Sequence, residues 1–220
     1  MRTAQANRFG RFGAAVLSMT LAACAQTPPA PSVAAEPSPQ PAKLTAARTE
    51  TPSPRASAEE SLQGDKPPEW QPTRWLNSPP LRLAELRGKV VLVRWWTAGC
   101  PFCSASAPAL RRFHAEYGPK GLVVVGMYHH KDEGAFEPRV YEDTAKRYGF
   151  TFPLAFDPEW RTLKSWLHGV DTGWTSVTFV LDKEGTVRHV HPGGQYVEGD
   201  PAHAKLRTVV EQLLAENDRR

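Results

Sequence analysis

The sequence has little excess of either charge. Its 27 basic and 23 acidic residues give a formal net charge of +4, and three of the arginines, Arg2, Arg8 and Arg11, lie near the N-terminus. Without that N-terminal segment the excess falls to about one positive charge, so the basic pI says little about the rest of the chain. The sequence contains no basic stripe, and we therefore expect no binding to nucleic acid.

Cysteine is also scarce, with three residues in 220. Cys100 and Cys103 can pair with each other, which leaves Cys24 over. Cys24 follows an N-terminal stretch in which arginines precede an apolar run, Phe12 to Ala23. The run is too short for a membrane-spanning helix. A charged start followed by such a run is typical of a secretory signal, which we predict over residues 1–23.

The end of this segment, Leu21-Ala22-Ala23-Cys24, resembles a bacterial lipoprotein signal. The resemblance implies cleavage before Cys24 and acylation of that cysteine; ordinary cleavage with an unrelated Cys24 is the alternative. Acyl chains would hold the protein at a membrane without spanning it. We therefore expect an exported protein, lipid-anchored to a bacterial membrane and facing the periplasm. Ala25 slightly favours the outer membrane, by analogy with sorting rules.

Large apolar side chains are nearly absent from residues 24–65, which are rich in Pro, Ala, Ser and Thr. Such a segment cannot bury enough surface to offset the entropy of ordering it, and its prolines favour extended conformations. We predict a disordered tether here, with an ordered N-terminal subdomain as the alternative. Residues 66–220 are then the folded domain, which is long enough for one sizeable core.

The most informative stretch runs from Trp95 to Cys103. An apolar run, Val90 to Val93, leads into it, and a helical pattern starts at Pro101. At a strand-to-helix junction, two cysteines three apart can close a disulfide across the first helical turn, where free N–H groups stabilise a thiolate. Cys100 is then the expected attacking thiol and Cys103 the shielded resolving thiol. A permanent disulfide and a zinc or copper site are the alternatives.

Periodicity and turn residues predict the other elements. Continuous apolar runs predict buried strands over 89–96 and 121–128, and a strand hairpin is expected over 177–182 and 186–191. Helices are expected over 101–117, 135–148, 159–167 and 201–215. A short hairpin with strands near 75–76 and 81–83 precedes a helical turn over 83–86. This order predicts a mixed sheet with helices on both faces.

From about Trp75 onward the chain resembles a thioredoxin-fold domain of the exported TlpA/ResA type. The matching landmarks are Leu83 to Val93, the loop from Trp to Cys-x-x-Cys, Pro108, and Phe179 to Gly185. Residues Gly126 to Gly194 are similar to the thioredoxin-like domain attached to DipZ-type membrane proteins. The resemblance implies an α/β thioredoxin fold, with a mixed central sheet, helices on both faces and, in this chain, an N-terminal β-hairpin extension.

Several side chains are expected to shape the site around the cysteines. By resemblance, at least one of Trp95, Trp96 and Phe102 should form an apolar surface for partner peptides. Core packing of Trp95 is the alternative, because strand residues alternate faces. Pro101 fits the first helical turn because no N–H partner is needed there.

Arg94 lies six residues before Cys100, where thioredoxins often carry a buried Asp and TlpA-like proteins often an Asn. By the resemblance, an acid at this position would accept the proton of the resolving thiol. Arginine cannot act as that base. A guanidinium near the sulfurs would favour the thiolate and make the disulfide more oxidising. The alternative is that Arg94 reaches solvent or pairs with an acid elsewhere.

The family's cis-proline opposite the cysteines is missing. The matching position is Ser176, preceded by Thr175, and we expect a trans bond between them because a cis bond would cost about 3–4 kcal/mol. The loop, and with it substrate docking, should therefore differ from the family. Trp174 stands where glutathione-peroxidase-like proteins carry a Trp, which leaves a thiol peroxidase-like activity as a further alternative. Ser106 replaces an acid that TlpA-like proteins often carry.

The histidines form two pairs, His129 with His130 and His189 with His191. The second pair shares one face of a strand, but no third metal ligand is evident from spacing, so surface or core roles are expected. Asp157 belongs to no motif and is expected to be solvated.

These patterns together predict a cell-envelope thiol–disulfide oxidoreductase, working without cofactor or resident metal. By resemblance, it should reduce disulfides of exported proteins and receive electrons from a membrane thiol transporter. A copper- or zinc-binding module that uses the cysteine pair and a histidine is the alternative from a different class.

Overall fold

The computed structural model describes residues 59–131, 134–169 and 172–216. The predicted signal, Cys24 and most of the predicted tether lie outside these residues. Residues 59–62 are helical, Leu62 is buried, and the Gly64 N–H donates to the Val187 carbonyl at 2.8 Å. The folded part therefore starts several residues before the predicted boundary at residue 66.

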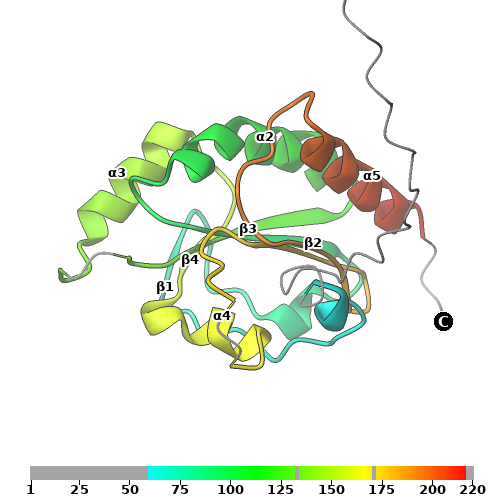
Figure 1. Cartoon of the computed structure of the whole chain (residues 1–220), viewed down its shortest axis with the longest axis horizontal. Helices are drawn as coiled ribbons and strands as arrows, with labels where there is room; N and C mark the ends of the chain where they lie inside the picture. Colours follow the sequence, from blue (N-terminus) through cyan, green and yellow to red (C-terminus); the bar gives the residue numbers. More distant parts are fainter. Residues whose placement is uncertain (1–58, 132–133, 170–171, 217–220) are drawn as a thin grey trace, which may run out of the picture. The chain divides into compact units, whose positions relative to one another are not determined.

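A mixed sheet of six strands, in the order β1-β4-β3-β2-β5-β6, forms the centre of the domain (Figure 1). Strands β2, β3 and β4 are parallel, whereas β1 is antiparallel to β4, β5 to β2, and β6 to β5. The strands are β1 (Arg74–Leu76), β2 (Val90–Trp96), β3 (Leu122–Tyr128), β4 (Leu154–Phe156), β5 (Thr178–Leu181) and β6 (Val187–His191). The predicted mixed sheet is confirmed.

Helices cover both faces of the sheet, also as predicted. Helices α2 (Pro101–Tyr117), α3 (Pro138–Tyr148) and α5 (Pro201–Ala215) lie on one face, and α4 (Arg161–Trp166) lies on the other (Figure 1). Three short 3-10 turns complete the described elements: η1 (Leu83–Leu86), η2 (Gly118–Lys120) and η3 (Pro158–Trp160). None of the helices in the described part is long and apolar enough to cross a membrane.

Strand β2 divides the core in two because its side chains alternate between the faces. Val90, Leu92 and Trp96 pack with Cys103 on the face of α2. Val91, Val93 and Trp95 pack on the opposite face with residues of α4. All seven residues of the strand are buried, which explains the continuous apolar run and makes the deviating Arg94 conspicuous.

The predicted N-terminal hairpin is wrong. Strand β1 pairs with β4, Trp75 facing Ala155, and the chain over 81–83 enters η1 rather than a strand. Asn77 turns the chain with a φ of +65°, and its side-chain amide donates to the carbonyls of Phe150 and Phe152, both at 3.0 Å. These bonds hold the end of β1 against the segment that leads into β4.

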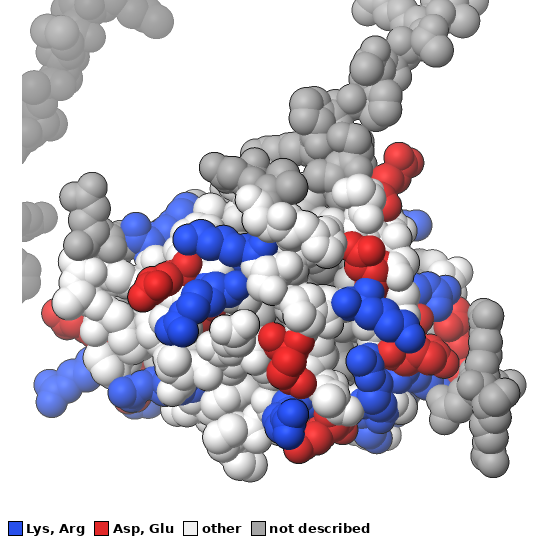
Figure 2. Space-filling model, turned by 90° about the horizontal axis from the view of Figure 1, so that it is seen from below, with Lys and Arg blue, Asp and Glu red and all other residues white. Residues whose placement is uncertain are grey.

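Charged side chains of both signs are interspersed on the face seen in Figure 2. The exposed ion pairs include Arg188 with Glu216 and Arg207 with Glu116. Such exposed pairs contribute little to stability, typically about 0–1 kcal/mol each.

Gly126 on β3 offers a test of packing, because side chains of the core leave little room for a side chain at this position. A Cβ at this position would lie 2.6 Å from Leu154 Cδ2 and 3.0 Å from Trp96 Nε1. Overpacking of this kind costs about 1–3 kcal/mol, so Gly126→Ala should lower the free energy of unfolding by that amount in denaturant titrations. Gly134→Ala is the matched control, since a Cβ there meets nothing within 4 Å; equal stability of the two variants would contradict the prediction.

Candidate redox-active site

The cysteine pair lies where the chain passes from the end of β2 into the start of α2. Cys100 is the N-cap residue of α2, and Cys103 lies in its first turn. The two form a disulfide, with their Cα atoms 5.2 Å apart. Cys100 is partly exposed, whereas Cys103 is buried at 2% exposure. An incoming thiol or disulfide can therefore reach only the first sulfur directly.

The start of α2 presents donors to the Cys100 sulfur. The backbone N–H of Cys103 donates to Cys100 Sγ at 3.2 Å, and Pro101 occupies the first helical position. A sulfur at this place meets the positive end of the helix dipole as well as this N–H. Both interactions favour a thiolate over a thiol when the disulfide is opened.

Two clefts that share Phe102 and Thr175 in their walls lie near the disulfide. The first, of about 480 Å³, has Cys100 in its wall together with Phe102, Lys131 and Thr175. The second, of about 320 Å³, extends from Phe102 and Thr175 to Gly194. Phe102 borders both clefts and is 49% exposed, so it is the aromatic residue that offers apolar surface beside the sulfurs.

Trp95 and Trp96 are both core residues. Trp96 is 1% exposed and packs against the rings of Tyr128 and Tyr141. Trp95 lies on the opposite face of the sheet, and its Nε1–H donates to Asp157 Oδ2 at 3.0 Å. Of the three aromatic residues expected to frame the motif, only Phe102 is exposed.

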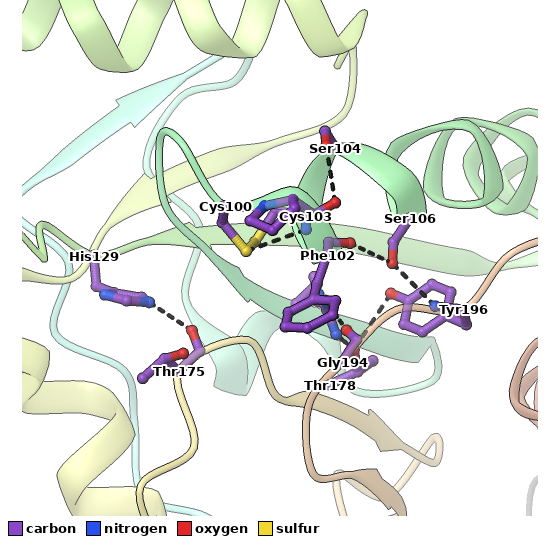
Figure 3. The surroundings of a disulfide bond; sticks show 12 residues. Cys100, Phe102, Cys103, Ser104, Ser106, His129, Thr175, Thr178, Gly194 and Tyr196 are labelled. Atoms are coloured by element: carbon purple, nitrogen blue, oxygen red, sulfur yellow. Dashed lines mark hydrogen bonds between the residues drawn. A yellow bond between two sulfur atoms is a disulfide. The ribbon is translucent and has the colours of Figure 1, made fainter.

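The loop before β5 faces the disulfide, as Figure 3 shows for Thr175. Thr175 lines both clefts, while Trp174 and Ser176 are buried at 3% and 4% exposure. The indole N–H of Trp174 has no hydrogen-bond partner among the residues that the structure describes. The sequence thus placed this loop correctly beside the cysteines; the trans bond between Thr175 and Ser176 stays a prediction.

His129 anchors that loop, a role that the sequence did not reveal. The side chain is fully buried, and its Nε2 lies 2.6 Å from the Thr175 carbonyl oxygen (Figure 3). Nε2 must carry the proton for this hydrogen bond, which leaves Nδ1 without a partner. Burial lowers the pKa of His129 to about 4, and the charge of Lys131 acts in the same direction. The imidazole is therefore neutral near pH 7.

Asp157 is fully buried, so the expectation that it is solvated is wrong. One carboxylate accepts from Trp95 Nε1 and from the backbone N–H groups of Thr162 and Leu163, at 2.8 to 3.1 Å. It therefore links β2 to the first turn of α4. These three N–H donors satisfy the hydrogen-bonding needs of the buried side chain.

Arg94 is buried at 1% exposure, on the α2 face of β2. Its Nη1–H donates to Thr178 Oγ1 at 3.2 Å, and its Nη2–H to the Gly194 carbonyl at 2.7 Å. The guanidinium carbon lies 5.0 Å from the centre of the Tyr196 ring. Arg94 does not reach solvent, and no described carboxylate pairs with it. The alternative expected from the sequence, a solvent-exposed or acid-paired arginine, is therefore wrong.

The histidine pair on β6 is partly buried. Burial lowers the pKa of both His189 and His191 to about 4, and the charge of Arg94 contributes for His191. Within the described residues, no three His, Cys, Asp or Glu side chains are grouped closely enough to hold a metal ion.

Comparison with known proteins agrees with this geometry. The family model described as Redoxin matches residues 63–209. DipZ of Mycobacterium bovis is 35% identical over 147 residues, which cover 64% of this chain and 19% of that protein. The thiol-disulfide oxidoreductase ResA of Geobacillus kaustophilus is 27% identical over 56% of this chain and 65% of its own. The chain thus spans less than two thirds of either relative.

The crystal structure of a DsbF homologue from Corynebacterium diphtheriae shares the fold. Its TM-score is 0.58 at 24% identity, covering 74% of this chain and 98% of that one. The thioredoxin-like fold predicted from the sequence is therefore confirmed.

The low pKa of His129 predicts a pH dependence of stability. Unfolded histidine binds a proton near pH 6.5, whereas folded His129 does so only at about pH 4. The unfolded chain thus binds more protons between these values, and stability falls as the pH is lowered through them, by about 1.4 kcal/mol per unit of pKa difference.

Denaturant titrations from pH 7.5 to 4 should show this loss, and His129→Gln should make it shallower. His189 and His191 act with the same sign, so part of the slope should remain. An NMR titration that finds the His129 pKa near 6.5 would contradict the prediction.

Proposed function

This chain belongs to the Redoxin family, and from that premise we propose that it is a thiol–disulfide oxidoreductase of the bacterial cell envelope. One observation carries the proposal: a partly exposed sulfur and a buried sulfur form a disulfide at the N-terminus of a helix, beside an open cleft. The name of the ResA relative, a thiol-disulfide oxidoreductase, supports it.

The cycle uses the difference in exposure between the two sulfurs. The Cys100 thiolate attacks a substrate disulfide, so a bond between Cys100 and substrate forms and the second substrate sulfur leaves as a thiolate. Deprotonated Cys103 then attacks the Cys100 sulfur, closes the internal disulfide and releases the first substrate sulfur. Two electrons pass from the cysteine pair to the substrate, and two protons follow to the released thiolates.

The proposed direction is reduction of exported protein disulfides. Electrons would return from a thiol transporter in the membrane, whose dithiol reduces the Cys100–Cys103 disulfide by the same two exchanges in reverse. The lipoprotein-like signal ending at Cys24 supports a place at a membrane surface, facing the periplasm. A tether before the domain would let it reach partners away from that surface.

Substitution of each cysteine separates the two chemical roles. In a Cys24→Ser background, Cys100→Ser should abolish reduction of insulin by dithiothreitol, because the accessible nucleophile is gone. Cys103→Ser should instead accumulate a mixed disulfide through Cys100, because nothing resolves it. Turbidity and intact-mass measurements give the two readouts; full turnover in both variants would rule out the proposal.

Phe102 should contribute to the docking of peptide substrates. Removing its exposed ring with Phe102→Ser should raise KM for a peptide disulfide several-fold, because apolar surface beside the cleft is lost. The reaction with dithiothreitol, a small thiol, should be little changed.

Val140 on α3 is a suitable comparison, since it is similarly exposed, at 46%, but does not line the clefts around the disulfide. Val140→Ser should leave both reactions as they are. If Phe102→Ser behaves like Val140→Ser, peptide docking does not use this ring.

A further inference from the structure

The guanidinium of Arg94 is a buried charge with no anionic partner among the described residues. Arg94 is 1% exposed, and its two terminal nitrogens donate to neutral oxygens of Thr178 and Gly194. Burial lowers its pKa from the usual value, and the nearby Tyr196 acts in the opposite direction. Burying a charge without a counter-ion is unfavourable, so this arrangement calls for a reason.

One hydrogen-bond donor of Arg94 remains unused within the described part of the chain. Its Nε is buried and has no partner among the described residues, whereas Nη1 and Nη2 both donate. Buried polar groups are nearly always hydrogen-bonded, and the exceptions often have a functional explanation. A buried, unpaired N–H of a cation is a ready donor for an anion that forms at another stage of the cycle.

The buried sulfur of Cys103 is the candidate for that anion. Leu92 and Trp96, two residues to either side of Arg94 on β2, pack in the same core cluster as Cys103. Arg94 projects to this same face because strand side chains alternate.

The contact partners of Arg94, Gly194 and Tyr196, lie next to residues of the first turns of α2. Gly194 and Phe102 line one cleft, and the N–H of Tyr196 donates to Ser106 Oγ at 3.1 Å. Figure 3 shows Thr178 and Gly194 beside Phe102, and Tyr196 beside Ser106 of α2.

We propose that Arg94 holds the buried Cys103 as a thiolate once the disulfide is reduced, with Nε–H donating to its sulfur. This inference rests on the proposed exchange cycle. In a thiol-based cycle the resolving cysteine must lose its proton to a base before it attacks the mixed disulfide. Here Cys103 leaves the opened disulfide as a thiolate and stays unprotonated, while the proton of the reducing thiol passes to water. The Cys103 thiolate then attacks Cys100 directly. Its lone pair forms the new S–S bond, and the electron pair of the broken bond between Cys100 and substrate leaves with the substrate thiolate.

Two other ionisable groups described around Arg94 are neutral. Tyr196 is buried and its pKa is raised, so it stays neutral; His191, with a pKa of about 4, is also neutral, with Asp200 and His189 acting on it from nearby. Lys131 and Arg147 each line a pocket that has the more exposed Cys100 in its wall. Among these described groups, Arg94 is therefore the ionised side chain that we assign to Cys103.

A titration of Cys103 alone tests the proposal. In the full chain carrying Cys24→Ser and Cys100→Ser, Cys103 is the only thiol, and its thiolate absorbs near 240 nm. We expect a Cys103 pKa well below the ordinary cysteine value of about 8.5. Adding Arg94→Asn should raise it enough to lower the thiolate-to-thiol ratio at least tenfold at a given pH, and Arg94→Lys should restore part of the effect.

Arg112→Asn is the matched control, since Arg112 is an exposed arginine on α2 that pairs with Glu198. It should leave the Cys103 titration unchanged. If Arg94→Asn and Arg112→Asn give the same titration as the parent, the proposal is overturned.

The intact cysteine pair provides a second readout. In the Cys24→Ser chain, Arg94→Asn should shift the equilibrium with glutathione towards the disulfide at least tenfold, because the reduced form loses its stabilised thiolate. If turnover of insulin persists while neither measurement responds to Arg94, the exchange function stands and this inference fails. If the Cys24→Ser chain, with Cys100 and Cys103 intact, shows no exchange at all, the proposed function itself fails.

A measurement on unsubstituted Arg94 avoids any effect on folding. In the Cys24→Ser chain, the Nε–H resonance of Arg94 should move downfield when the disulfide is reduced, because a hydrogen bond to a thiolate forms. The resonance of Arg112 should stay in place. An Arg94 resonance that is the same in both redox states would exclude the contact.

Discussion

The position of the cysteine pair depends on one junction, where a strand buried on both faces passes into the first turn of a helix. Strand β2 lies in the middle of the sheet, bonded to β3 on one side and β5 on the other. Its residues have little freedom to move, so the chain leaves it at a fixed point. Cys100 then caps α2 through its sulfur, and the helix itself supplies the donors that favour a thiolate there.

A second wall of the site comes from distant parts of the sequence. The loop at Thr175 is held by His129, 46 residues earlier in the chain, and the loop at Gly194 is held by Arg94, 100 residues earlier. Both anchoring side chains are buried; Arg94 lies on β2, and His129 directly follows β3. Hydrogen bonds from buried polar side chains thus hold the loops that line the clefts beside the disulfide, in addition to apolar packing. These bonds fix the shape of a site that has Ser176 where the resemblance implies a proline.

The elements with strong local patterns were predictable from the sequence. The residues of β2, with their unbroken apolar run, and of α2, bounded by Pro101 and Gly118, lie where expected. The pairing of β1 with β4 was not predictable, because each strand has three residues and the partners lie far apart in the chain. The exchange pair was evident from its spacing, whereas nothing local marked His129 as an anchor.

Asp157 shows why burial is hard to predict for polar residues. In the sequence it precedes a proline at the start of a helical segment and looks like an exposed cap. Its burial depends on Trp95, which is 62 residues away and contributes the indole donor. The same holds for Arg94, whose hydrophobic neighbours on β2 indicated a buried strand without indicating what would receive the guanidinium.

The short strand β1 has a consequence for how the domain behaves among other proteins. It forms one border of the sheet with only three residues. At the opposite border, the backbone of Gly64 and Asp65 bonds to Val187 at the start of β6. Open sheet borders offer unpaired N–H and C=O groups to other chains and promote aggregation. Borders this short or partly covered give another unfolded chain little backbone on which to add a strand.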